Sequence, residues 1–148
     1  MNPVVRDYQV SDRDACLAIF DSNIPDYFDQ SERDMFADFL NGPSGFYFVI
    51  AQDGQVCACG GYAKEDRGQA RFTWGMAERG RHGQGLGRLL AEHRLAEITA
   101  SGLFQEIELF TTPIIAPFFQ KFGFTVKETR KDGFAPGMDQ VQMIKWLD

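Results

Sequence analysis

Three glycines at alternate positions, Gly83, Gly85 and Gly87, run directly into an apolar helical pattern that begins with Leu86 and Leu89. The first amides of a helix have no partner within the helix, and the macrodipole places positive potential there. Glycine has no Cβ and lets the main chain approach a ligand closely. A glycine-rich turn at a helix start, such as residues 83–87 (the glycine corner), can bind phosphate or pyrophosphate without a lysine. The segment therefore predicts an anion site, although a plain turn between strand and helix would also use these glycines.

The elements that must position this corner follow from hydrophobic periodicity and turn residues. Strands are expected at residues 4–8, 46–52, 55–63, 70–76, 106–111, 124–131 and 141–146. Helices are expected at residues 12–20, 31–40, 86–101 and 114–122, and a loop at 132–139. The order β-α-α-β-β-β-α-β-α-β-β predicts one mixed α/β domain over residues 1–148. Its sheet is mostly antiparallel, with one strand–helix–strand crossover that makes a parallel pair.

Composition narrows the class of protein. The 148 residues carry a net charge of −6, which argues against a nucleic-acid partner because phosphate-backbone affinity needs a basic surface. The sequence has neither an apolar run of membrane-span length nor a signal-peptide pattern, so neither membrane insertion nor secretion is expected. Cys16, Cys57 and Cys59 are expected to be reduced core thiols, which fits the cytoplasm. With two histidines and no Cys/His cluster, no metal site is expected.

From Val4 to about Leu147 the order of elements resembles the GNAT superfamily of N-acetyltransferases, which share the acyl-CoA N-acyltransferase fold. The family's motif, Gln/Arg-x-x-Gly-x-Gly/Ala at the start of the central helix, is matched by residues 82–87, with His82 where Gln or Arg is usual. A second family element, Tyr-x-x-x-Gly-Phe, is similar to residues 119–124, with Phe119 in the tyrosine position. Both motifs in this order are far more specific than the glycines alone.

The resemblance implies an acyltransferase that moves an acetyl group from acetyl-CoA to a primary amine by direct attack on the thioester. It also implies a sheet splayed between the fourth and fifth strands, where the pantetheine arm lies like an added strand. A main-chain amide near Met76 or Ala77 would polarise the thioester carbonyl. The implied coenzyme contacts are Met76, Ala77, His82, Gly83, Gln84, Gly85, Leu86, Gly87, Arg88, Thr112 and Phe119.

The catalytic residues stay unassigned at this level. In many relatives the tyrosine of the second motif returns a proton to the thiolate, but Phe119 has no hydroxyl and cannot take that role. The remaining candidates for the proton donor are a bound water, Tyr27, Tyr62, Thr111 and Thr112. The candidates for the base are Asp26, Glu78 and Glu108, each of which has a solvated surface charge as its alternative.

Two other functions compete with the enzyme. The missing tyrosine is compatible with a binding module that holds acyl-CoA without turning it over. A dinucleotide-dependent oxidoreductase is disfavoured, since Gly83-x-Gly85-x-x-Arg88 lacks the third glycine and repeated βαβ units are missing. The expected partner is a small-molecule or peptide amine, with no nucleic acid and no membrane. The loop at 131–139 folds over the substrate, contacts a second subunit in a homodimer, or simply covers the surface.

Overall fold

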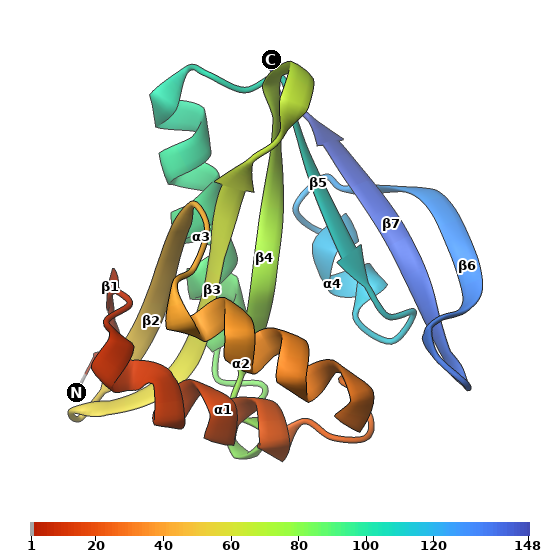
Figure 1. Cartoon of the computed structure of the whole chain (residues 1–148). Helices are drawn as coiled ribbons and strands as arrows, with labels where there is room; N and C mark the ends of the chain where they lie inside the picture. Colours follow the sequence, from red (N-terminus) through yellow and green to blue (C-terminus); the bar gives the residue numbers. More distant parts are fainter. Residues whose placement is uncertain (1) are drawn as a thin grey trace.

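A seven-stranded sheet in the order β1-β2-β3-β4-β5-β7-β6 organises residues 2–148, the part of the chain that the computed structural model describes (Figure 1). The strands are β1 Val4–Asp7, β2 Phe46–Gln52, β3 Gln55–Lys64, β4 Gln69–Ala77, β5 Glu106–Thr111, β6 Thr125–Ala135 and β7 Met138–Trp146. The helices are α1 Arg13–Ser22, α2 Arg33–Asn41, α3 Leu86–Ser101 and α4 Ala116–Gln120. Short 3-10 turns are η1 Val10–Asp12, η2 Gln30–Glu32, η3 Asp66–Gly68 and η4 Arg79–Arg81. None of the helices in this described part is long and apolar enough to cross a membrane.

The sheet is antiparallel except between β4 and β5, which confirms the predicted crossover. These two strands pair only from Gln69 opposite Glu106 to Arg71 opposite Glu108. Beyond that point β4 runs on to Ala77 and β5 to Thr111 without pairing each other. In Figure 1 the two ribbons start together near the C-terminus and then diverge. The predicted splay between the fourth and fifth strands is therefore confirmed.

Helices cover both faces of the sheet. Successive side chains of a strand point to opposite faces, and β2 is apolar on both of them, so both faces must be buried. Tyr47 and Val49 belong to a buried cluster with side chains of α1 and α2, whereas Phe48 packs in a second cluster with Ile98 of α3 and Ala116 of α4. Figure 1 accordingly shows α1 and α2 in front of the sheet and α3 behind it. All three cysteines are buried thiols within these layers. The fourth and fifth strands thus diverge between two packed faces.

The prediction of a loop at residues 132–139 is wrong. β6 continues to Ala135 and β7 begins at Met138, so the segment is a hairpin with a tight turn at residues 136–137. A bulge between Arg130 and Ala135 hides the strand pattern, because Asp132 adopts a φ of 56° there. Asp132 still receives a hydrogen bond from the Gly137 amide at 2.8 Å, which closes the turn. Side-chain oxygens accept some of the hydrogen bonds that strand carbonyls would otherwise accept. Hydrophobic periodicity carries no signal of this replacement, so the strand was not predicted here.

Candidate active site

The glycine corner lies between η4 and the first turn of α3. Gly83 and Gly85 have φ values of 86° and 83°, a left-handed conformation that favours glycine. A Cβ at either position would meet no atom within 4 Å, so both glycines border open space. Gly85 is the N-cap of α3 and has no side chain with which to accept from the first amides. The first turn of α3 therefore presents its amides and its positive dipole end without obstruction.

Hydrogen bonds connect the C-terminal end of α1 and the glycine corner to the end of β4. Asn23, only 1% exposed, donates hydrogen bonds to the carbonyls of Ala77 and Ile19, each at 2.9 Å. His82 Nε2 lies 3.0 Å from the same Ala77 carbonyl, and the Tyr27 ring stands edge-on to the His82 ring at 5.0 Å. The C-terminal end of α1 is thereby fixed to β4 and to the corner. His82 and Tyr27, predicted from unrelated patterns, are neighbours in the structure.

The remaining predicted contacts gather around the splay. Met76 and Ala77 end β4, Thr112 follows β5, and Phe119 lies on α4. A Cβ at Gly87 would lie 3.5 Å from the Phe118 ring, which shows that α4 adjoins the start of α3. The structure thus brings the two predicted motifs, far apart in the sequence, to the same end of the diverging strands.

A β-bulge marks β4 just beyond its last pairing with β5. The register against β3 shifts between Cys59 and Gly61, and Trp74 has a φ of 36°. Tyr47 Oη donates to the Trp74 carbonyl at 2.7 Å, and Phe36 stacks near the Trp74 ring at 5.0 Å. A non-glycine residue with positive φ is strained, and here this hydrogen bond and ring packing hold it in place. The bulge turns the end of β4 away from β5.

Two buried hydroxyl groups without a protein partner lie near this divergence. Within residues 2–148, Oγ1 of Thr73 on β4 and Oγ1 of Thr112 after β5 have no hydrogen-bond partner. A buried polar atom without a partner calls for an explanation, and a ligand or ordered water is the usual one. Sequence reasoning placed Thr112 here but missed Thr73, since a threonine in a strand carries no signal of its own.

We expect Thr112→Val to lower kcat/KM for acyl transfer by about tenfold, because one ligand hydrogen bond is worth roughly 1–1.5 kcal/mol. The melting temperature should stay the same or rise, since valine fills the same volume without an unpartnered hydroxyl. Steady-state kinetics and thermal unfolding of the same preparation check both parts. Unchanged kcat/KM would show that the hydroxyl faces no ligand.

Each acid considered as a base is held by an arginine. Asp26 pairs with Arg79, and Glu78 pairs with Arg81 at 2.7 Å. Glu108, only 5% exposed, accepts from Arg71 at 2.6 Å and from Gln142 at 2.7 Å, so that both of its oxygens are engaged. The described residues contain no group of three or more metal-binding side chains. Each carboxylate considered as a base is therefore already in contact with a cation of the same chain.

The hydroxyl groups considered as proton donors lie in different parts of the fold. Tyr62 Oη donates to Glu97 of α3 at 3.0 Å; burial and this bond raise the pKa of Tyr62 to about 12. Thr111 pairs with Val141 of β7. Phe119, at the position of the family's tyrosine, is surrounded by aromatic rings; their centroids lie 6.3 Å, 5.1 Å and 5.7 Å away for Phe72, Phe118 and Phe124. Of the donor candidates, Tyr27 contacts His82 of the first motif, and the Thr112 carbonyl accepts hydrogen bonds from the amides of Ile115 and Ala116 at the start of α4.

Comparison with known proteins agrees with this geometry. The model of the acetyltransferase (GNAT) family matches residues 15–124. The ribosomal-protein-S18-alanine N-acetyltransferase of Escherichia coli superposes with a TM-score of 0.83 at 18% identity, covering 99% of this chain and 95% of that chain. Ard1 from Thermoplasma volcanium gives a TM-score of 0.84 at 14% identity, covering 100% and 99%. Curated proteins yielded no match. At these identities the structural likeness concerns the fold.

Proposed function

Because the chain belongs to the acetyltransferase (GNAT) family, we propose that it transfers an acetyl group from acetyl-CoA to a primary amine by direct attack on the thioester. The observation that carries this proposal is the unobstructed first turn of α3 together with the ends of β4 and β5, which do not pair with each other. A helix start of this kind suits a pyrophosphate, and two diverging strands offer main-chain groups to the pantetheine arm. The buried thiols fit a cytoplasmic setting for the reaction.

In this proposal the chain binds the coenzyme, orients its thiol arm and polarises the thioester carbonyl. Amides of the corner hold the pyrophosphate, with support from Arg88, and Phe119 packs against the thiol arm. An amide near Met76 or Ala77 donates to the thioester oxygen as negative charge develops on it. The residues proposed for these contacts are Met76, Ala77, His82, Gly83, Gln84, Gly85, Leu86, Gly87, Arg88, Thr112 and Phe119.

Proton transfer is assigned mainly to solvent. The candidate acids are all ion-paired, so the amine reaches the thioester after losing its proton to water. No tyrosine stands at residue 119, and the sulfur leaves as a thiolate, which is a fairly good leaving group. The rate should then rise with pH up to the pKa of the acceptor amine itself.

The acceptor is proposed to approach near the end of β5. A pocket of about 260 Å³ is lined by Phe110, Glu128, Arg130, Gln140 and Gln142. Phe110 directly precedes Thr111, the last residue of β5, and Arg71 lies over its ring at 5.5 Å. Acidic, basic and amide groups together suit a small polar amine or the N-terminal residue of a peptide.

We expect Phe119→Tyr to leave kcat unchanged or to raise it by about threefold at most, since the added hydroxyl can donate a proton that water otherwise supplies. The ring position is already occupied by an aromatic side chain, so stability should change little. Initial rates of acetyl transfer by both proteins at pH 7 and pH 9 check this, with Phe122→Tyr as the matched control. A complete loss of activity would mean that residue 119 does not face the thiol arm.

Calorimetric titration with acetyl-CoA, followed by an assay of free thiol release over an amine panel, tests the proposed function. The panel should pair small amines with an alanine N-terminal peptide, because the matched Escherichia coli protein is named for a ribosomal-protein alanine. Binding together with amine-dependent thiol release supports the enzyme. Binding without release favours the acyl-CoA-binding module. A lack of binding to any CoA thioester contradicts both, and tight binding of a nicotinamide dinucleotide would revive the oxidoreductase.

A further inference from the structure

Arg94, on the third turn of α3, is a buried cation without an acidic partner. Its residue is only 3% exposed, and within residues 2–148 no carboxylate forms an ion pair with it. The guanidinium makes two long hydrogen bonds, from Nε to the Leu90 carbonyl at 3.4 Å and from Nη1 to the Gly61 carbonyl at 3.3 Å. Its Cζ atom lies 3.9 Å from the centre of the Phe72 ring. Both acceptors are neutral main-chain carbonyls at the long end of hydrogen-bond distances.

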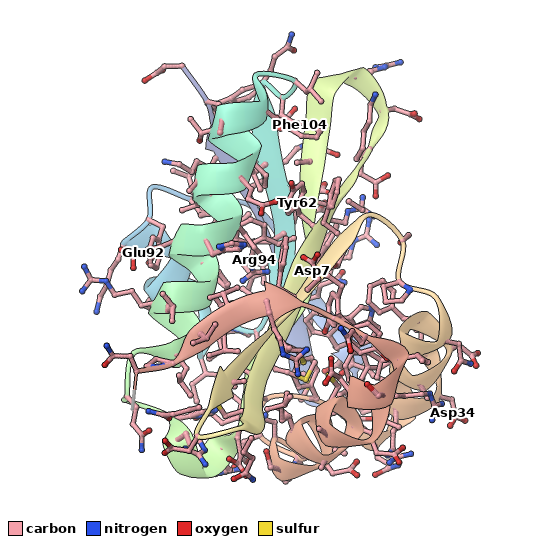
Figure 2. All side chains as sticks on the ribbon, turned by 90° about the vertical axis from the view of Figure 1, so that its left-hand side faces the viewer. Asp7, Asp34, Tyr62, Glu92, Arg94 and Phe104 are labelled. Carbon is pink, nitrogen blue, oxygen red and sulfur yellow. The ribbon has the colours of Figure 1, made fainter. Side chains whose placement is uncertain are left out.

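Glycines on two strands make room for this side chain. A Cβ at Gly75 would lie 3.1 Å from both terminal nitrogens of Arg94, and a Cβ at Gly60 would lie 3.4 Å from one of them. Figure 2 shows Arg94 on the inner side of α3, facing the strands. The guanidinium therefore rests on the main chain of β3 and β4, at the bulge where β4 turns away from β5.

A buried charge without a counter-ion destabilises a fold, and an apolar residue of similar size is often neutral or stabilising in its place. Burial lowers the pKa of Arg94 to about 10, so the side chain still carries its full charge at pH 7. The contacts that receive this charge are the face of the Phe72 ring and the carbonyls of Leu90 and Gly61, and none of them carries a negative charge. The position of the charge therefore calls for a functional explanation.

Two aromatic rings in contact, Phe72 and Phe119, connect the charge of Arg94 to the proposed reaction centre. Phe72, on which the guanidinium stacks, contacts the Phe119 ring, and Phe119 is proposed to lie beside the coenzyme thiol. Gly75, against which Arg94 rests, directly precedes Met76, whose amide is proposed to contact the thioester. In an interior from which water is excluded, a fixed charge acts over such distances far more strongly than in water.

We propose that Arg94 stabilises the negative charge that develops on the coenzyme sulfur during acetyl transfer. The inference rests on the proposed function. The amine nitrogen forms a bond to the carbonyl carbon, the carbon–sulfur bond breaks, and its electron pair stays on sulfur as a thiolate. The amine proton goes to solvent, and the thiolate later takes a proton from solvent. Since Phe119 cannot donate a proton at this step, a stabilised thiolate replaces the protonated thiol as the leaving group.

The pKa of the bound CoA thiol measures this effect directly. It is obtained from thiolate absorbance near 240 nm, as the difference between protein saturated with CoA and protein saturated with desulfo-CoA. We expect a thiol pKa about one unit below that of free CoA in the unsubstituted protein, and a return towards the free value in Arg94→Met. Arg94→Lys should keep most of the depression. Arg33→Met, which removes a half-exposed charge paired with Asp21 at the start of α2, should leave the thiol pKa unchanged.

Kinetics and stability complete the test. Arg94→Met should lower kcat by about tenfold, the factor that matches a one-unit pKa change, with little effect on KM. Its melting temperature should be unchanged or higher, which a purely structural arginine would not allow. Equal thiol pKa values in both proteins, with CoA binding intact, overturn the inference alone. A failure of the unsubstituted protein to bind CoA overturns the proposed function and the inference with it.

Discussion

Gly85→Glu is expected to weaken acetyl-CoA binding by about a thousandfold. Gly85 caps α3 in open space, so the new carboxylate would occupy the volume in which the pyrophosphate is proposed to lie. Two like charges about 4 Å apart near a protein surface repel by roughly 4 kcal/mol, which corresponds to about three orders of magnitude in affinity. Calorimetric titration with acetyl-CoA measures the change.

Gly85→Gln separates charge from strain. Any side chain at a φ of 83° costs the fold about 1 kcal/mol, and glutamine pays the same cost as glutamate without the charge. Gly85→Gln should therefore bind acetyl-CoA about a hundredfold more tightly than Gly85→Glu. Gly54→Glu, at another exposed glycine with a φ of 77°, should lose similar stability and no affinity. If Gly85→Glu binds as well as the unsubstituted protein, the pyrophosphate lies elsewhere.

Local patterns predicted the fold because each element carries its own signal. The spacing of glycines before Leu86 identified the start of α3, and the apolar run at residues 46–52 matched β2 to the residue. The splay between β4 and β5 was predicted only from the family resemblance, because it depends on which distant segments pair with each other. The bulge near Asp132 was missed because a side-chain acceptor replaces the regular ladder there.

The site was predictable where the main chain forms it and much less so where side chains do. Glycines at positive φ are rarely interchangeable with other residues, so they mark the corner in the sequence. The arginine partners of Asp26 and Glu108 come from other elements, and no local pattern pairs them. Only the Glu78–Arg81 pair is local, with a spacing of three residues. Arg94 looks like an ordinary polar position in a helix. Its burial becomes visible only when β3 and β4 are in place beneath it.

Gly61→Ala should destabilise the protein by about 3 kcal/mol or more, because its Cβ would enter the main chain of a neighbouring strand. A Cβ on Gly61 would lie 2.0 Å from the Phe46 carbonyl oxygen and 2.8 Å from the Tyr47 Cα. Neither atom is the end of a flexible side chain, so β2 and β3 would have to separate. For a chain of this size such a loss lowers the melting temperature by roughly 10 °C, as thermal unfolding would measure.

Gly80→Ala is the matched control, since a Cβ at Gly80 would meet no atom within 4 Å, and it should change stability by about 0.5 kcal/mol at most. The comparison also bears on Arg94, whose Nη1 donates to the Gly61 carbonyl. If β3 moves away from β2, that carbonyl moves with it, and the buried guanidinium loses one of its few acceptors. A Gly61→Ala protein as stable as Gly80→Ala would mean that β2 and β3 do not approach so closely. The glycine-lined space around Arg94 would then need another explanation.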